Sequence, residues 1–288
     1  MKTILYATDC TKNDASALKY AYRFSYIMKA DLHVLHVYDF PPIHLSVIQP
    51  IEKLQNRMKQ EKKDIVKKFC ETHLKNEFRE TPIKIHAVEN TSVEDAIIDT
   101  AKKLSPDLVI LGMKDDHSHR GFFASNIANE LLDRVNFPVM MIPNGIDYTC
   151  ISTIVYATDF EQQDIIPITK LIEIVRPFEA LIEIVHIYHT DTTTARERME
   201  QFKNMLLEQV SYDDMTFKTI ASDKIKSGII SVINSENASM LAMLERKHEF
   251  RLDNPFRKDL VKEIKTRVDI PVIAFSKRNT KTKEAVIA

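Results

Sequence analysis

The chain has 288 residues, of which 44% are hydrophobic, and its 40 basic and 41 acidic side chains give a net charge of −1. At roughly 150 residues per domain, this length predicts about two domains, each with enough apolar residues for a core. The balanced charge argues against nucleic acid or an anionic membrane as a partner. No apolar run approaches the ~18 residues needed to span a bilayer.

Three cysteines, Cys10, Cys70 and Cys150, lie far apart in the sequence. The N-terminus leads directly into an apolar strand, without the basic and apolar regions of a secretion signal. Reduced thiols in a cytoplasmic protein are therefore expected. Cys10 directly follows Asp9, and we expect it to be a small half-buried residue, although a reactive thiol remains an alternative.

The first half alternates apolar strands with amphipathic helices. Strands are predicted at residues 3–8, 32–37, 83–88, 108–111 and 139–142. The helices between them have apolar residues three or four positions apart, at Leu18, Ala21, Tyr22 and Met28, at Ile51, Leu54, Met58, Ile65 and Phe69, at Val93, Ala96, Ile97, Ala101 and Leu104, and at Ile127, Leu131, Leu132 and Val135. Asn13 is predicted to cap the first helix, and residues 143–147 form a linker.

The second half repeats this plan. The segment at 4–9 returns at 154–159, an offset of 150 (154 − 4), and the segment at 137–142 returns at 270–275, an offset of 133 (270 − 137). So long a period indicates duplicated domains, predicted at 1–147 and 148–288. Strands are expected at 153–158, 181–187, 217–221, 240–243 and 272–275. Helical faces are expected at Ile168, Leu171, Ile172 and Val175, at Ala195, Met199, Phe202 and Leu206, at 229–233, and at Leu260 and Ile264.

Apolar strands that alternate with amphipathic helices predict parallel sheets covered on both faces. Right-handed crossovers then give two doubly wound α/β domains. In such domains ligands bind beyond the carboxyl ends of the strands, where the strand order reverses. If the first and fourth strands flank that point, Asp9 and Gly112 line one crevice.

Several short motifs resemble the universal stress protein family, in both halves. They are Ala7-Thr8-Asp9, His36-Val37, the run from Leu108 to Gly112, and Asn136-Phe137-Pro138-Val139. The resemblance implies five-stranded parallel sheets of order 3-2-1-4-5. It also implies that the last strands, 139–142 and 272–275, pair within one molecule as a pseudo-dimer, which leaves a monomer or a homodimer open.

ATP-binding members of that family have a loop of Gly, two residues, Gly, nine residues, then Gly and Ser or Thr. Here Gly112 is followed by Asp115 in the place of the second glycine, and Ser125 and Asn126 occupy the last two positions. A like-charge contact at ~4 Å costs about 4 kcal/mol at an effective dielectric of 20, around a thousandfold in affinity. Lys114 and Arg120 offset part of that charge.

The resemblance therefore implies a partly degraded site in the first domain, with Asp9, Val37, Gly112, Lys114, Ser125 and Asn126 as candidate cofactor-binding residues. Adenosine or AMP is favoured there over tight binding of ATP. In the second domain Leu244 replaces Gly112, and Lys258 with Asp259 replaces the last pair, although Asp159 is retained. We expect no nucleotide there.

Other polar residues have a structural and a functional interpretation. Asp9 and Asp159 either bind a ribose or adenine edge or cap a turn after the strand. His36 and His186 are expected to be hydrogen-bonded structural residues rather than catalytic bases. His117 and His119 have the composition of a zinc-binding tract, but a solvated loop is favoured and no metal is expected.

Three further segments are assigned structural roles. The lysine-rich stretch 59–75 is predicted to be a solvated helix face, and Met58, Met199 and Met205 are predicted to fill the core. The proline-bounded segment 42–50 is expected to dock as a lid, with a functional gate as the alternative.

The leading hypothesis is a cytoplasmic, non-enzymatic stress-response protein that acts by binding an unidentified protein or small ligand. A carrier or sensor of an apolar, lipid-like ligand held between the domains is the alternative. An enzyme that hydrolyses nucleotides would need a Ser-Gly-Gly-x-Asp-Ser or His-x-Gly-His loop. The stretches at 8–12 and 158–162 contain neither motif.

Overall fold

The computed structural model describes residues 1–40, 50–75, 82–113, 124–189, 192–245 and 268–276, without the side chains of 124–126. The chain divides into two compact units. One comprises Met1–Val135 with Met141–Tyr148, and the other comprises Asn136–Met140 with Thr149–Ala288. The predicted boundary after residue 147 and the predicted pairing of the two last strands stay predictions.

The first half forms a parallel α/β sheet of order β3-β2-β1-β4-β5, as predicted. Its elements are β1 (Thr3–Ala7), η1 (Lys12–Asp14), α1 (Ala15–Ile27), β2 (Asp31–Tyr38), α2 (Ile51–Leu74), β3 (Ile83–Glu89), α3 (Val93–Leu104), β4 (Leu108–Gly112), α4 (Ala124–Arg134) and β5 (Val139–Ile142).

The second half has the same topology, β8-β7-β6-β9-β10, with parallel pairing throughout. Its elements are β6 (Thr153–Ala157), η3 (Gln162–Asp164), α5 (Ile165–Val175), η4 (Arg176–Phe178), β7 (Leu181–Tyr188), α6 (Thr192–Leu207), β8 (Met215–Ala221), α7 (Ile225–Ser235), β9 (Met240–Glu245) and β10 (Val272–Ser276). The predicted helix with Leu260 and Ile264 lies outside the described residues.

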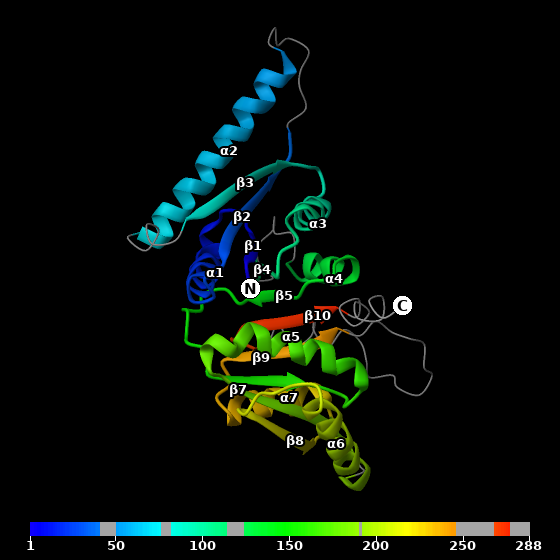
Figure 1. Ribbon diagram of the computed structural model, residues 1–288. Helices are drawn as coiled ribbons and strands as arrows, with labels where there is room; N and C mark the ends of the chain where they lie inside the picture. Colours follow the sequence, from blue (N-terminus) through cyan, green and yellow to red (C-terminus); the bar gives the residue numbers. More distant parts are fainter. Residues whose placement is uncertain (41–49, 76–81, 114–123, 190–191, 246–267, 277–288) are drawn as a thin grey trace. The chain divides into compact units, whose positions relative to one another are not determined.

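Helices cover both faces of the first sheet, which makes the domain doubly wound. In Figure 1, α1 and α2 lie on one side of the strands and contact each other, and α3 and α4 do so on the other side. In the second half, α6 contacts β7 and β8, whereas α7 contacts β6 and β7. The central strands β1, β4, β6 and β9 are almost continuously apolar and buried, as expected of parallel strands covered on both sides, whereas β3 and β8 are mostly half-buried or exposed.

The start of α1 differs from the prediction. The expected inner face is confirmed, because Leu18, Ala21, Tyr22 and Met28 are all buried. The predicted cap at Asn13 is wrong, since the 3-10 turn η1 precedes the helix and Asp14 takes the N-cap position. Asp14 turns its carboxylate inward to the hydroxyl of Thr8.

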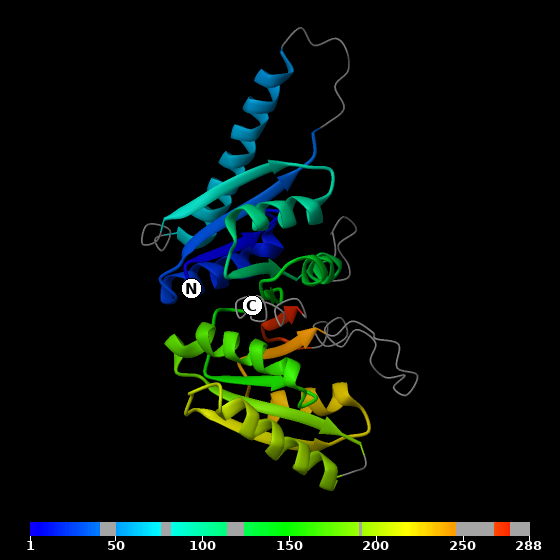
Figure 2. The same cartoon turned by 45° about the vertical axis from the view of Figure 1, so that its right-hand side comes forward.

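The helix α2 is only partly covered. Its buried residues, Val66, Phe69, Cys70 and Leu74, all lie in its C-terminal half, whereas Ile51 is 59% exposed and Ile65 46% exposed. In both views the N-terminal turns extend past β2 and β3 (Figures 1 and 2). The predicted helix is confirmed, and of its predicted apolar positions Phe69 is buried while Leu54 and Met58 are half-buried. Burial is wrong as an expectation for Ile51 and Ile65.

The solvated face predicted for residues 59–75 holds for most of its lysines. Pairs four residues apart, such as Lys67 and Glu71, add small helical contributions. Met58, Met199 and Met205 were predicted to lie in the core, but all three are only half-buried.

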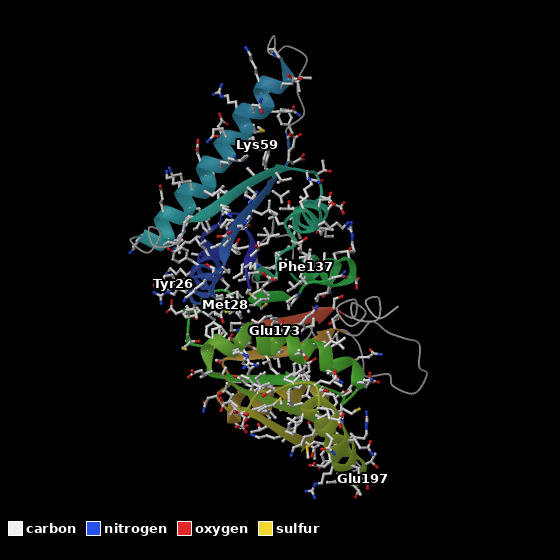
Figure 3. All side chains as sticks on the ribbon, in the orientation of Figure 1. Tyr26, Met28, Lys59, Phe137, Glu173 and Glu197 are labelled. Carbon is white, nitrogen blue, oxygen red and sulfur yellow. The ribbon has the colours of Figure 1, made fainter. Side chains whose placement is uncertain are left out.

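Exposed side chains lie on the outer sides of the helices. Tyr26 on α1, 56% exposed, points away from the sheet, and Glu197 lies on the outside of α6 (Figure 3). After β5 the chain turns at Asn144 and Gly145, where a φ of 75° favours glycine. None of the helices in the described ranges is long and apolar enough to cross a membrane.

Candidate functional site

The predicted site residues of the first half meet at one edge of the sheet. The register pairs Ala7 of β1 with Leu35 of β2 and with Leu111 of β4. Asp9, Val37 and Gly112 therefore all lie at the carboxyl ends of three adjacent strands. Strand order reverses between β1 and β4, which is where doubly wound domains bind ligands.

A hydrogen-bonded turn follows β1. Oδ1 of Asp9 accepts a bond from the backbone N–H of Thr11 at 3.0 Å, and the N–H of Asp9 donates to Oδ2 of Asp14 at 3.1 Å. The hydroxyl of Thr8 donates to the same Oδ2 at 2.8 Å and accepts from the N–H of Cys10 at 2.9 Å. The turn role predicted for Asp9 is thus confirmed, while its role in binding a ligand stays a prediction.

Asp14 is the buried charge of this site, with only 3% of its surface exposed. Burial, followed by the negative charge of Asp9, raises the pKa of Asp14 to about 6, although the hydrogen bond from Thr8 acts in the opposite direction. At neutral pH the Asp14 carboxyl is therefore mainly ionised, but it takes up a proton at a higher pH than an ordinary aspartate does. The sequence pattern did not single out Asp14.

Gly112 packs directly against this carboxylate. A Cβ at position 112 would overlap Oδ1 of Asp14 and would lie 3.1 Å from the Cβ of Ala17. In the first half, a side chain at position 112 would therefore require the Asp14 carboxylate to move. An acidic group beside this glycine also disfavours a polyphosphate, whereas an uncharged nucleoside meets no such repulsion.

His36 is bonded to the backbone, as predicted. Its Nδ1 lies 3.1 Å from the carbonyl oxygen of Thr8. Burial lowers the pKa of His36, the carbonyl bond and Asp9 oppose that shift, and Lys62 adds to it. The imidazole is thus neutral at pH 7 and donates its Nδ1–H to the carbonyl.

Lys62 is a site residue that the sequence pattern hid. It projects from α2 to the carboxyl end of β2, where its ammonium lies 5.9 Å from the ring centre of Tyr38 and its charge acts on His36. Within a lysine-rich helix, nothing in the spacing distinguishes this residue from its solvated neighbours.

The phosphate-loop positions cannot be placed. Lys114, Asp115 and Arg120 lie outside the described residues, as do His117 and His119 and most of the segment 42–50. Ser125 and Asn126 lie in the first turn of α4, and their side chains are not described. Their roles stay predictions. Within the described ranges, no three His, Cys, Asp or Glu side chains gather as metal ligands.

The second half repeats the strand-end network. The hydroxyl of Thr158 donates to Oδ2 of Asp164 at 2.8 Å and accepts from the N–H of Phe160 at 2.8 Å. The hydroxyl of Tyr156 donates to Oδ1 of Asp164 at 3.0 Å. His186 Nδ1 lies 2.9 Å from the carbonyl oxygen of Thr158 and so repeats the role of His36.

The two strand ends nevertheless differ. Ile4 pairs with Leu108 and Ile154 pairs with Met240, so the register places Leu244 at the position of Gly112, as the sequence alignment predicted. Lys258 and Asp259 lie outside the described residues.

Two more side chains distinguish the end of β6. The ring centre of Phe160, at the position of Cys10, lies 5.0 Å from that of His186 and 5.5 Å from that of Phe202. Arg198 of α6 donates to the backbone carbonyl of Asp159 at 2.7 Å. No sequence pattern indicates this contact, because it joins a helix surface to a strand end.

A doubly wound parallel sheet, duplicated in one chain and with polar residues at its topological switch point, defines an α/β protein of the doubly wound class. The family model described as "Universal stress protein family" matches residues 1–143. Residues 1–143 belong to this family, and the second half repeats the same fold in tandem.

Solved structures show the same fold over nearly the whole chain. A universal stress protein from Archaeoglobus fulgidus is 14% identical with a TM-score of 0.67, over 96% of this chain and 98% of that one. A putative universal stress protein from Pseudomonas aeruginosa is 13% identical with a TM-score of 0.63, over 97% and 95%. The cytoplasmic domain of a prokaryotic cation chloride cotransporter is 11% identical with a TM-score of 0.54, over 96% of each chain. No curated protein matches the chain.

Proposed function

We propose that the protein is a non-enzymatic, cytoplasmic stress-response protein that binds adenosine or AMP at one site, in its first half. The observation that carries this proposal is the convergence of Asp9, Val37 and Gly112 at the switch point between β1 and β4. Family membership of residues 1–143 supports it. Intramolecular pairing of the last strands, in a monomer or a homodimer, belongs to the same proposal.

The charge around the site favours a nucleoside or a monophosphate over ATP. The buried carboxylate of Asp14 lies against Gly112, and the sequence places a second acidic residue, Asp115, at the position of a loop glycine. Each negative group raises the cost of bringing a triphosphate close. Lys62, at the end of β2, offers one positive charge within the electrostatic reach of His36.

Side chains at the strand ends of the second half support the proposal that no nucleotide binds there. Leu244 stands where the first half has a bare Cα, and the Phe160 ring is buried against His186 and Phe202. The guanidinium of Arg198 already binds the carbonyl of Asp159.

Binding rather than catalysis is supported by the hydrogen bonds of the strand-end network. The hydroxyl of Thr8 donates to Asp14 and accepts from the N–H of Cys10, and His36 is bonded to a main-chain carbonyl. A nucleophile needs an adjacent base, and these groups are instead bonded within the turn.

Isothermal titration of the full chain with adenosine, AMP and ATP tests the proposal. Asp9→Asn retains an acceptor for the N–H of Thr11 but removes the charge, and Asp159→Asn is the matched control in the second half. We expect Asp9→Asn to weaken AMP binding about tenfold, the loss of one charge-assisted hydrogen bond. The control should have no effect, and Asp115→Gly should improve ATP binding relative to AMP.

Micromolar ATP binding in both halves, or equal effects of the two Asp→Asn variants, would contradict the proposal. Mass spectrometry of the purified protein separates it from the carrier hypothesis. A co-purified apolar compound, together with no heat from AMP, would favour the carrier.

A further inference from the structure

Two histidines on neighbouring strands form a stacked pair in the first half. Nδ1 of His33 on β2 lies 2.9 Å from Nε2 of His86 on β3, and the rings lie 5.0 Å apart and within 10° of parallel. His33 is 8% exposed and His86 is half-buried. The hydrogen bond requires one of the facing nitrogens to carry a hydrogen and the other to present a lone pair.

The same two positions hold an ion pair in the second half. The register pairs Leu5 with His33 and Val155 with Glu183, so Glu183 corresponds to His33. It pairs Leu35 with His86 and Val185 with Lys218, so Lys218 corresponds to His86. Nζ of Lys218 lies 2.9 Å from Oε1 of Glu183 and 2.7 Å from Oε1 of Glu236.

The surroundings of the histidine pair disfavour positive charge. Lys84 of β3 bonds Asp31 of β2 at 2.6 Å, and Lys63 of α2 acts on His86. The buried residues of α3, which packs on β2, are apolar or hydroxyl-bearing: Ala96, Ile97, Ile98, Thr100 and Ala101. The pKa of His33 is lowered by burial and then by Lys84, while Asp31 opposes the shift. The pKa of His86 is lowered by burial and by the positive charges of His33, Lys63 and Lys84.

We propose that the His33–His86 pair makes the first half of the protein acid-sensitive: below about pH 6.5 the pairing of β2 with β3 weakens, whereas the Glu183–Lys218 pair keeps β7 and β8 together. Once both imidazoles are cationic, both facing nitrogens carry hydrogen and the bond between them cannot exist. Two charges about 5 Å apart would then repel each other within the sheet.

The direction of the pH dependence of stability follows from the difference in histidine pKa between the folded and the unfolded chain. In the unfolded chain the histidines take up protons at their ordinary pKa of about 6.5, whereas the folded pair resists protonation. The stability from the neutral pair is therefore present above about pH 6.5 and is lost as the pH falls through the lowered pKa values. His36 and His73, whose pKa values are also lowered, act in the same direction. Asp14, with a raised pKa of about 6, acts in the opposite direction.

Hydrogen–deuterium exchange of the full chain at pH 7.5 and pH 5.5, corrected for intrinsic exchange rates, tests the proposal. Peptides from β2 and β3 should lose about tenfold in protection at pH 5.5, after allowance for solvent screening of the pair. Peptides from β7 and β8 should change less than twofold.

Replacing the pair by its counterpart, His33→Glu with His86→Lys, isolates its contribution, because Asp14, His36 and His73 remain. This variant should retain most of the protection of β2 and β3 at pH 5.5. If it fails to fold, His86→Gln keeps a hydrogen-bonding partner that does not titrate, and it should retain part of that protection, because His33 still titrates in it. Equal loss of protection in both halves, or undiminished acid sensitivity in whichever variant folds, would overturn the proposal.

Discussion

Replacing Gly112 by alanine is the sharpest test of how the first strand end is built. The new Cβ would overlap Oδ1 of Asp14 and would lie 3.1 Å from the Cβ of Ala17, so the buried carboxylate must move. Moving it strains its bonds to Thr8 and to the N–H of Asp9. Gly112 does not have a positive φ, so the backbone itself accepts alanine.

The expected cost comes from overpacking, which typically amounts to about 1–3 kcal/mol. Alanine also restricts the unfolded chain, which offsets roughly 0.5 kcal/mol. A net loss of about 1–2 kcal/mol in the free energy of unfolding is therefore expected for Gly112→Ala. When Asp14 is also alanine the overlapping oxygen is gone, and the same change at position 112 should be neutral or slightly stabilising.

Urea unfolding of wild type, Gly112→Ala, Asp14→Ala and the double variant gives the coupling energy, expected at about 2 kcal/mol. Gly228→Ala in α7 is the comparison, because its Cβ would lie 2.8 Å from Cγ2 of the buried Ile187 and not against a carboxylate, so its cost should be the same with and without Asp14. An equal cost of Gly112→Ala with and without Asp14 would refute the packing explanation of this glycine.

Two further predictions concern the thiols and the second sheet. Burial raises the pKa of Cys10 and of Cys70 to about 12, whereas Cys150 is exposed. A disulfide reagent at pH 8 should therefore modify one thiol quickly in the native protein, and none after Cys150→Ser. Fast reaction of all three thiols would contradict the burial of Cys10 and Cys70. Lys218→Met leaves Glu183, with a side chain only 3% exposed, without its cation. The Lys218→Met variant should lose about 2 kcal/mol in the free energy of unfolding measured in urea, less than is usual for a buried pair because a third of the lysine side chain is exposed. Adding Glu183→Leu should recover most of the loss. An unchanged urea midpoint for Lys218→Met would argue against a stabilising ion pair.

The fold could be predicted because two independent patterns agreed. Short apolar runs alternated with three-and-four-residue helical spacing, and the chain repeated this order at an offset of 150 residues. All ten predicted strands are present, and Leu244 occupies the position that the alignment gave it. Residues such as Leu131 and Ile168 lie inward because helical spacing alone determines which face is apolar.

The missed features depend on contacts between elements that are distant in sequence. The apolar residues from Ile51 to Ile65 have the spacing of a buried helix face, but that spacing does not show that the helix extends beyond the sheet. Asn13 and Asp14 are both good caps, and the hydroxyl of Thr8 and the N–H of Asp9 hold the carboxylate of Asp14 inward. Lys62 and Arg198 reach strand ends from helix surfaces, and His33 meets His86 diagonally across two strands.

The second half acts as a built-in control for the first. Each half has the same strand-end contacts among a threonine, a buried aspartate and a histidine, with Thr158, Asp164 and His186 in the second. That network persists where Leu244 has replaced the glycine, so forming it does not depend on the bare Cα that a phosphate site needs. Its residues are therefore explained by folding, and the case for a ligand depends on what the second half lacks, a residue without a side chain at the position of Leu244, beside the counterparts of Asp9 and Val37.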